Sequence, residues 1–145
     1  MNIRKLRRNR LNSLCMRIEY TRTLKTTVST IQELLMTTLT VHKKQRLEEQ
    51  KNLEELKQAM KRCEELLQED PDRDDAKKNQ QIINKNFDDY RKALSIRTVT
   101  RMDTLETLQD TIAAVNEMIK AELPKHMQLG YLIDFNTAVE TVNQD

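Results

Sequence analysis

The sequence is poor in the residues that make tight turns. One glycine and two prolines occur in 145 residues, and tryptophan is absent. A strand-rich fold needs many hairpins built on glycine and proline, so this composition argues against one. Aromatic residues make up 3% of the chain and charged residues 33%, which is typical of long helices that touch along narrow seams. The sequence therefore predicts an all-α protein with a single domain.

Long apolar runs are also missing. No stretch of eighteen apolar residues occurs, so no transmembrane helix is expected. No apolar core follows the charged opening residues, so no secretory signal is expected either. The Arg-rich opening fits the rough description of a mitochondrial presequence, but the apolar spacing continues from it without a cleavage-like break. The two cysteines, Cys15 and Cys63, have no second ligand at metal spacing, so no zinc site is expected. A disulfide within the chain is not expected either, and this cysteine usage fits a reducing, intracellular location in the cytoplasm or nucleus.

Catalytic motifs are absent from the sequence. No glycine-rich phosphate loop, HExxH or GxSxG occurs. The two histidines, His42 and His126, fall in different predicted elements, and no nucleophile is placed beside either. His42 falls at a heptad d position and is interpreted as a packed or register-setting polar group. We therefore expect no enzyme activity, no cofactor and no small-molecule substrate.

One stretch, EDPDRDDAKKNQ at residues 69–80, resembles a metal site. Aspartates occupy the first, third and fifth places of a calcium-loop pattern: Asp70, Asp72 and Asp74. The sixth place needs glycine and the twelfth a bidentate glutamate, but these places hold Asp75 and Gln81. An aspartate followed by Pro71 is instead a typical helix start. The stretch is interpreted as a turn between two helices, with the second beginning at Pro71 and no metal bound.

Apolar residues recur at heptad spacing through the first half of the chain. With Leu11 as position a, eleven of the seventeen a and d positions through Leu67 are apolar. In the middle of this stretch the stripe drifts, and the apolar positions there are Leu24, Ile31 and Leu34. The pattern predicts one long helix over residues 1–69. The segment TTLTVHKK crowds β-branched residues, which have weaker helix propensity. Residues 37–44 are therefore the place where a bend in this helix is expected. A complete break near Thr38, closing a compact three- or four-helix bundle, is the alternative.

A second long helix is predicted over residues 70–123. One heptad frame holds seven apolar residues, with Tyr90 and Met102 beside it: Phe87, Leu94, Leu105, Leu108, Ile112, Val115 and Ile119. This helix is expected to stop near Leu123, before Pro124. With only a short turn between them, the two helices are expected to form a coiled-coil-like antiparallel hairpin.

Residues 124–145 are predicted to form a short amphipathic C-terminal helix. Tyr131, Leu132 and Phe135 form an apolar cluster that must be covered. The segment can dock back on the hairpin, where it could complete a bundle, or on a neighbouring subunit. We favour the neighbour, because no lysine or arginine follows Lys125 and the acidic side chains could face a basic helix.

The amino end of the first helix is the other predicted partner interface. Because the first helix is longer than the second, the second cannot cover Leu11, Leu14 and Ile18. Residues 1–25 carry eight basic groups against Glu19 alone, a balance of +7. The first ten residues hold the basic patch of Arg4, Lys5, Arg7, Arg8 and Arg10. Such a patch can meet an acidic protein surface, nucleic acid, microtubules or anionic lipid.

These patterns favour a non-catalytic coiled-coil structural subunit, of cytoskeletal type, that joins partner helices from other chains in an elongated multiprotein complex. Two alternatives stay open. The chain could be a compact helical adaptor or chaperone that binds a client segment, or a module that binds a polyanion through its basic amino end. A hydroxyl-rich band between Thr21 and Thr40 could accept phosphates, but it is interpreted as a weak helix held by packing.

Overall fold

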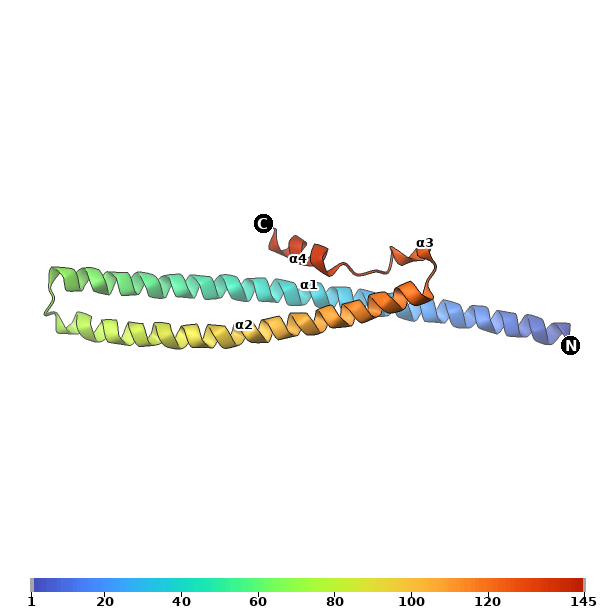
Figure 1. Cartoon of the computed structure of the whole chain (residues 1–145), viewed down its shortest axis with the longest axis horizontal. Coiled ribbons are helices and arrows are strands. Elements are labelled where there is room, and N and C mark those ends of the chain that lie inside the picture. The colour runs from blue at the N-terminus through green and yellow to red at the C-terminus, as the bar shows by residue number, and fades with distance from the viewer. Residues whose placement is uncertain (1, 145) are drawn as a thin grey trace. The chain divides into compact units, whose positions relative to one another are not determined.

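The computed structural model describes residues 2–144, and over this range the fold is all-α (Figure 1). Two long helices, α1 (Ile3–Glu69) and α2 (Asp74–Glu122), pack against each other as an antiparallel hairpin, which confirms the predicted fold class. The one-turn helix α3 (Lys125–Gln128) and the short helix α4 (Phe135–Asn143) follow. The chain divides into two compact units. Unit 1 joins residues up to Thr38 with those from Leu108 on, and unit 2 comprises Leu39–Thr107.

Helix α1 is a single uninterrupted helix of 67 residues. Its sequence contains neither glycine nor proline, so nothing in it removes a backbone donor or favours a break. The threonines of the hydroxyl-rich band stay in the helix by bonding the carbonyl four residues earlier, as Thr23 does to Glu19 and Thr27 to Thr23, both at 2.9 Å. The alternative fold that required a break near Thr38 is therefore wrong.

The turn between the long helices differs from the prediction at one point. Helix α2 begins at Asp74, three residues after the expected start at Pro71. The reason is local: the Asp70 carboxylate accepts a hydrogen bond from the backbone N–H of Asp72 at 3.2 Å, and the Asp70 carbonyl accepts one from Arg73 at 3.2 Å. Asp70 thus shapes a turn rather than a helix cap. Asp75 in the first helical turn pairs with Arg73 at 2.9 Å.

The seam of unit 2 follows the predicted heptad. Leu39, Leu53, Leu56, Met60, Cys63 and Leu67 of α1 are buried or half-buried. On α2 the predicted Phe87, Tyr90, Leu94 and Leu105 are half-buried as well. Met102 was expected beside this frame but is 63% exposed, and Arg101 takes the seam position instead. The positively charged side chain of Arg101 therefore lies in the seam, next to the position where the sequence analysis expected the apolar side chain of Met102.

Unit 1 holds the most completely buried residues. Leu35 is 1% exposed and Ile119 is not exposed at all. The rest of its apolar core comes from α1, α2 and the C-terminal segment: Leu24, Val28, Leu108, Ile112, Val115 and Ile133. The drift to Leu24 and Ile31 is confirmed by their burial, but Leu34 is 53% exposed. This core fixes where the amino-terminal part of α1 emerges from the fold.

The C-terminal segment forms a shorter helix than the apolar pattern predicted. Helix α4 begins at Phe135, so Tyr131 and Leu132 lie outside it. Asp134 caps α4 by accepting a hydrogen bond from the Thr137 backbone N–H at 3.0 Å and one from its hydroxyl at 2.8 Å. These bonds lower the pKa of Asp134 below its ordinary value. A side-chain cap of this kind sets the helix start at Phe135, the last residue of the apolar cluster.

Candidate functional site

The amino-terminal part of α1 is exposed along its whole length. All residues from Asn2 to Tyr20 are exposed, and α1 continues past the point where α2 ends (Figure 1). Asn2 starts the helix by accepting the Arg4 N–H on its side chain at 3.0 Å and the Leu6 N–H on its carbonyl at 3.1 Å. We call residues 3–20 of α1 the arm. The arm is thus a formed helix that the rest of the described chain leaves largely exposed.

The three apolar residues predicted as an interface lie on this arm. Leu11 is 64% exposed, Leu14 57% and Ile18 48%. Their spacing of three and four residues places them on one face of the helix. Met127 of α3 lines a shallow hollow with Leu14 and Ile18, but it leaves about half of each side chain exposed. The arm therefore presents an apolar stripe to solvent.

The five residues of the basic patch are on the same arm. Arg4, Lys5, Arg7, Arg8 and Arg10 are all exposed. Arg10 and Arg17 line a hollow on the arm together with Leu6 and Leu14. The structure therefore brings the predicted basic patch and the predicted apolar stripe together on one stretch of helix.

The other predicted interface residues pack on their own chain. Ile133, between Leu132 and Asp134, is 5% exposed. Asn116 of α2 donates a hydrogen bond to the Ile133 carbonyl at 2.9 Å and accepts one from its N–H at 3.0 Å. Of the two dockings considered, the segment takes the one on the hairpin of the same chain. Tyr131, Leu132 and Phe135 stay half-buried, so part of each remains available.

A groove runs between α2 and this segment in unit 1. Its volume is about 570 Å³, and its lining holds six apolar residues and five polar or charged ones: Gln109, Ile112, Ala113, Asn116, Lys120, Leu129, Leu132, Ile133, Asp134, Phe135 and Asn136. Leu129 is 89% exposed at its edge. The groove is therefore a second candidate surface in unit 1, and it mixes apolar and polar side chains.

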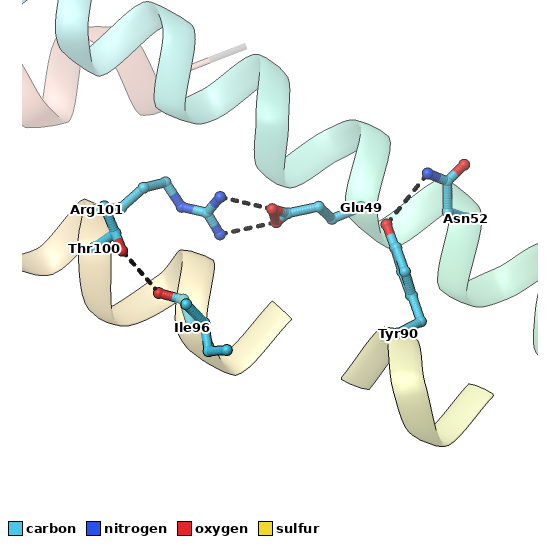
Figure 2. A network of polar contacts seen from close by, with 6 residues as sticks. All are labelled: Glu49, Asn52, Tyr90, Ile96, Thr100 and Arg101. Carbon is cyan, nitrogen blue, oxygen red and sulfur yellow. Dashed lines mark hydrogen bonds and ion pairs between the residues drawn. The ribbon is translucent and has the colours of Figure 1, made fainter. Parts of the chain in front are cut away.

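Unit 2 contains a buried ion pair that the sequence patterns missed. The guanidinium of Arg101 donates one hydrogen bond to each carboxylate oxygen of Glu49, at 2.6 Å and 2.8 Å (Figure 2). About nine tenths of each side chain is buried. The hydrogen bonds from Arg101 lower the pKa of Glu49 and raise that of Arg101. Nearby, Asn52 donates to the Tyr90 hydroxyl at 3.2 Å (Figure 2). These contacts form across the seam between α1 and α2 in the register that unit 2 adopts.

His42 lies one heptad before Glu49, and it is 8% exposed. Its Nδ1 atom has no hydrogen-bond partner among the described residues. Burial is the main cause of a lowered pKa for His42, and the positive charges of Arg101 and Arg46 lower it further. The interpretation of His42 as a packed polar group in the seam agrees with this burial. A groove of about 470 Å³ runs past His42, Glu49, Arg97 and Arg101.

Acidification is expected to destabilise the chain through His42. In the unfolded chain His42 has its ordinary pKa of 6.5, and in the folded chain its pKa is lower. The stability that the neutral imidazole confers is therefore complete above pH 6.5 and is lost as pH falls below it. Urea unfolding followed by circular dichroism should show a lower midpoint at pH 5.5 than at pH 7. His42→Leu should flatten this difference, and an unchanged difference in that variant would rule out His42 as its source.

The part of the chain that the structure describes contains no assembled metal site and no membrane-spanning helix. Among residues 2–144, no three histidine, cysteine or acidic side chains gather as they would around a metal ion. Within the same range, no helix has the length and apolar character needed to cross a membrane. Cys15 is exposed on the arm, whereas Cys63 is buried in unit 2. The arm and the groove of unit 1 are therefore the strongest candidates for a functional surface.

Comparison of the chain with protein-family models, with curated proteins and with solved structures gives no match in any of the three.

Two polar residues of structural importance, Arg101 and Asn116, were missed by sequence reasoning. Glu49 and Arg101 sit 52 positions apart, and their pairing depends on the hairpin register. A polar residue at a seam position is the only signal in the sequence that could have indicated Glu49 and Arg101. Asn116 gave no such signal, because its partners are the backbone groups of a distant residue.

Proposed function

We propose that this chain is a non-catalytic structural subunit whose arm pairs with a partner helix in a larger protein complex. One observation supports the proposal above the others: Leu11, Leu14 and Ile18 form an exposed apolar stripe on a helix that continues from a packed core. A stripe of this kind is the usual contact surface of a helix that pairs with another helix.

The energetics favour a partner on this stripe. Burying a leucine or isoleucine side chain stabilises by about 1.5–3 kcal/mol, so three of them offer a large share of a stable contact. An isolated helix of the arm's length is marginal in water, and most helical stability in proteins comes from packing. On its own chain the arm has only sparse contacts, from Met127 beside Leu14 and Ile18 and from Glu122 to Tyr20, and a partner would supply the packing that it lacks.

The charge of the arm indicates the chemistry of the partner. Basic side chains flank the apolar stripe, and Glu19 is the only acidic residue among residues 1–25. In paired helices the positions beside the apolar seam choose the partner through opposite charges. The partner helix should therefore carry glutamate or aspartate beside its own apolar stripe.

Changing Leu11, Leu14 and Ile18 together to glutamine should abolish pairing and leave the fold intact. The loss should be at least a hundredfold in affinity, because about 1 kcal/mol or more is lost at each position. A photo-crosslinker attached to the exposed Cys15 would record the partner chain directly in a native extract.

Met16→Gln is the matched control, since Met16 is 70% exposed on the opposite side of the same arm. It should leave crosslinking unchanged. If the triple variant crosslinks like the parent chain, the proposed function is wrong. If it loses helicity throughout, as circular dichroism would show, the stripe belongs to the fold.

The exposed basic patch favours a second candidate, binding of a polyanion. Arg4, Lys5, Arg7, Arg8 and Arg10 are all available for phosphate contacts. Binding to duplex DNA, to microtubules or to anionic vesicles should then weaken steeply with added salt. This candidate requires the patch but not the stripe, so the triple glutamine variant should bind such a polyanion as the parent does.

A further inference from the structure

The proposed function leaves the identity of the partner open, and the structure carries a surface of suitable charge. We propose that the arm of one copy of this chain docks on the groove of unit 1 in a second copy. The inference rests on the proposed function and names the partner of the same arm. The groove is the one lined by Ala113, Leu132, Asp134 and Phe135 among others.

The arm cannot fill the groove of its own chain. Every residue from Asn2 to Tyr20 is exposed, so none packs on the groove in the described structure. The arm is continuous with the buried part of α1, and it has neither glycine nor proline at which to fold back. An arm that docks on such a groove therefore has to use the groove of another copy.

Pairing of two arms with each other is disfavoured. Residues 1–25 carry a balance of +7, eight basic groups against one acidic. Two such helices side by side would bring like charges together along the whole contact, which destabilises paired helices. The arm needs an acidic surface.

One acidic and one basic side chain line the groove, Asp134 and Lys120, and Lys120 lies 3.8 Å from the Glu117 carboxylate; further carboxylates lie beside the lining residues on both walls. On α2, Asp110 and Glu117 lie three residues before and four residues after Ala113, which lines the groove, so all three share one face of the helix. On the other wall, Asp134 lines the groove. Glu140 lies four residues after Asn136, which lines it too. From Leu108 to the end of the sequence there are six acidic residues and two lysines, a balance of −4.

The groove also offers apolar surface to match the stripe. Leu129 is 89% exposed, and Leu132 and Phe135 are half-buried. Leu11, Leu14 and Ile18 of the arm are the apolar residues that could cover them. Apolar contact gives affinity here, and the opposite charges of arm and groove set the orientation.

Arm and groove belong to the same unit, so one two-fold axis produces the contact twice. Each copy then donates its arm and receives the arm of the other, which closes this contact as a dimer, and the dimer would be the unit that enters the larger complex. The dimer should be weakened by salt, because its charged residues lie at the surface.

Charge reversal tests the proposal with the full chain. Sedimentation velocity should give a species of twice the 17.2 kDa chain mass at low salt. Arg4→Glu, Arg7→Glu, Arg8→Glu and Arg10→Glu together take the arm from +5 to −3, and Asp110→Lys, Glu117→Lys and Glu140→Lys together take residues 108–145 from −4 to +2. Each reversed variant alone should be monomeric. A mixture of the two should form a heterodimer, since the reversed arm then faces the reversed groove and the two native surfaces face each other.

A reversal elsewhere serves as the control. Lys77→Glu with Lys78→Glu changes two exposed lysines of unit 2 and should leave the dimer unchanged. A crosslink confirms the geometry: a pool with Cys15 and native Asn136 is mixed with a pool that carries Cys15→Ser and Asn136→Cys. A bismaleimide product between the pools is necessarily intermolecular. Lys78→Cys in place of Asn136→Cys should give none.

A parent chain that stays monomeric at tens of micromolar and low salt would overturn the proposal, as would a mixture of the reversed variants that does not associate. The proposed function would survive that result if the triple glutamine variant still lost its crosslinked partner. The partner would then be a different acidic helical protein. If the triple variant lost no partner, the two proposals would fail together.

Discussion

Replacing Arg101 by alanine is expected to cost unit 2 about 2–4 kcal/mol of unfolding free energy. The substitution leaves the Glu49 carboxylate nine-tenths buried and without its bidentate partner, and an unpaired buried charge is among the most costly defects in a folded protein. The cost lies toward the lower part of the range for such pairs, because about a tenth of each side chain still reaches solvent. Urea unfolding followed by circular dichroism measures it.

The matched control replaces both partners. Glu49→Leu with Arg101→Leu removes the two charges together and fills the seam with apolar side chains, so it should be neutral or stabilising. If the double leucine variant is as unstable as Arg101→Ala, the ion pair itself stabilises the fold more than apolar side chains in the same places would, and the expectation is wrong. If Arg101→Ala itself costs less than about 0.5 kcal/mol, the pair is screened by solvent and its burial has no energetic consequence.

Replacing Ile119 by alanine is expected to cost about 3 kcal/mol and to loosen unit 1. Ile119 is fully buried, and its removal loses the transfer free energy of the missing carbons and leaves a cavity. Hydrogen exchange should show faster exchange first in α2 from Leu108 to Ile119 and in the residues of α1 that contact the same core. Thermal unfolding gives the total loss.

Ile96→Ala is the matched control, because the same atoms are removed from a side chain that is 69% exposed. It should change stability by less than about 0.5 kcal/mol. Equal losses in the two variants would show that the burial of Ile119 does not determine its contribution.

The helical fold was predictable because the information is local and repeated. Heptad spacing recurs through both long helices, and the near absence of glycine and proline excludes most other folds. The end of α1 at Glu69 agrees with the predicted boundary, and the end of α2 at Glu122 lies within one residue of it. The start of α2 was missed because the Asp70 side chain can cap a helix or shape a turn, and the sequence does not show which backbone N–H it binds.

The candidate surfaces were predictable only in part. The exposure of Leu11, Leu14 and Ile18 followed from the unequal lengths of the helices, which the sequence contains. The docking of the C-terminal segment on its own chain depends on Asn116, whose role requires a contact between residues 17 positions apart. The Glu49–Arg101 pair depends on the register of the hairpin in the same way. Long-range polar contacts of this kind leave no periodic pattern in a sequence.

The hydrogen bonds between Asn116 and Ile133 make it difficult for another chain to displace the C-terminal segment. Only 17 residues separate the two, so the segment docks as an intramolecular ligand whose effective concentration is on the order of millimolar. A free peptide with the same contacts would have to approach that concentration to displace it. The chain's own segment thus occupies the Ile133 position. A helix from another chain can contact only the exposed parts of Leu129, Leu132 and Phe135 in the groove.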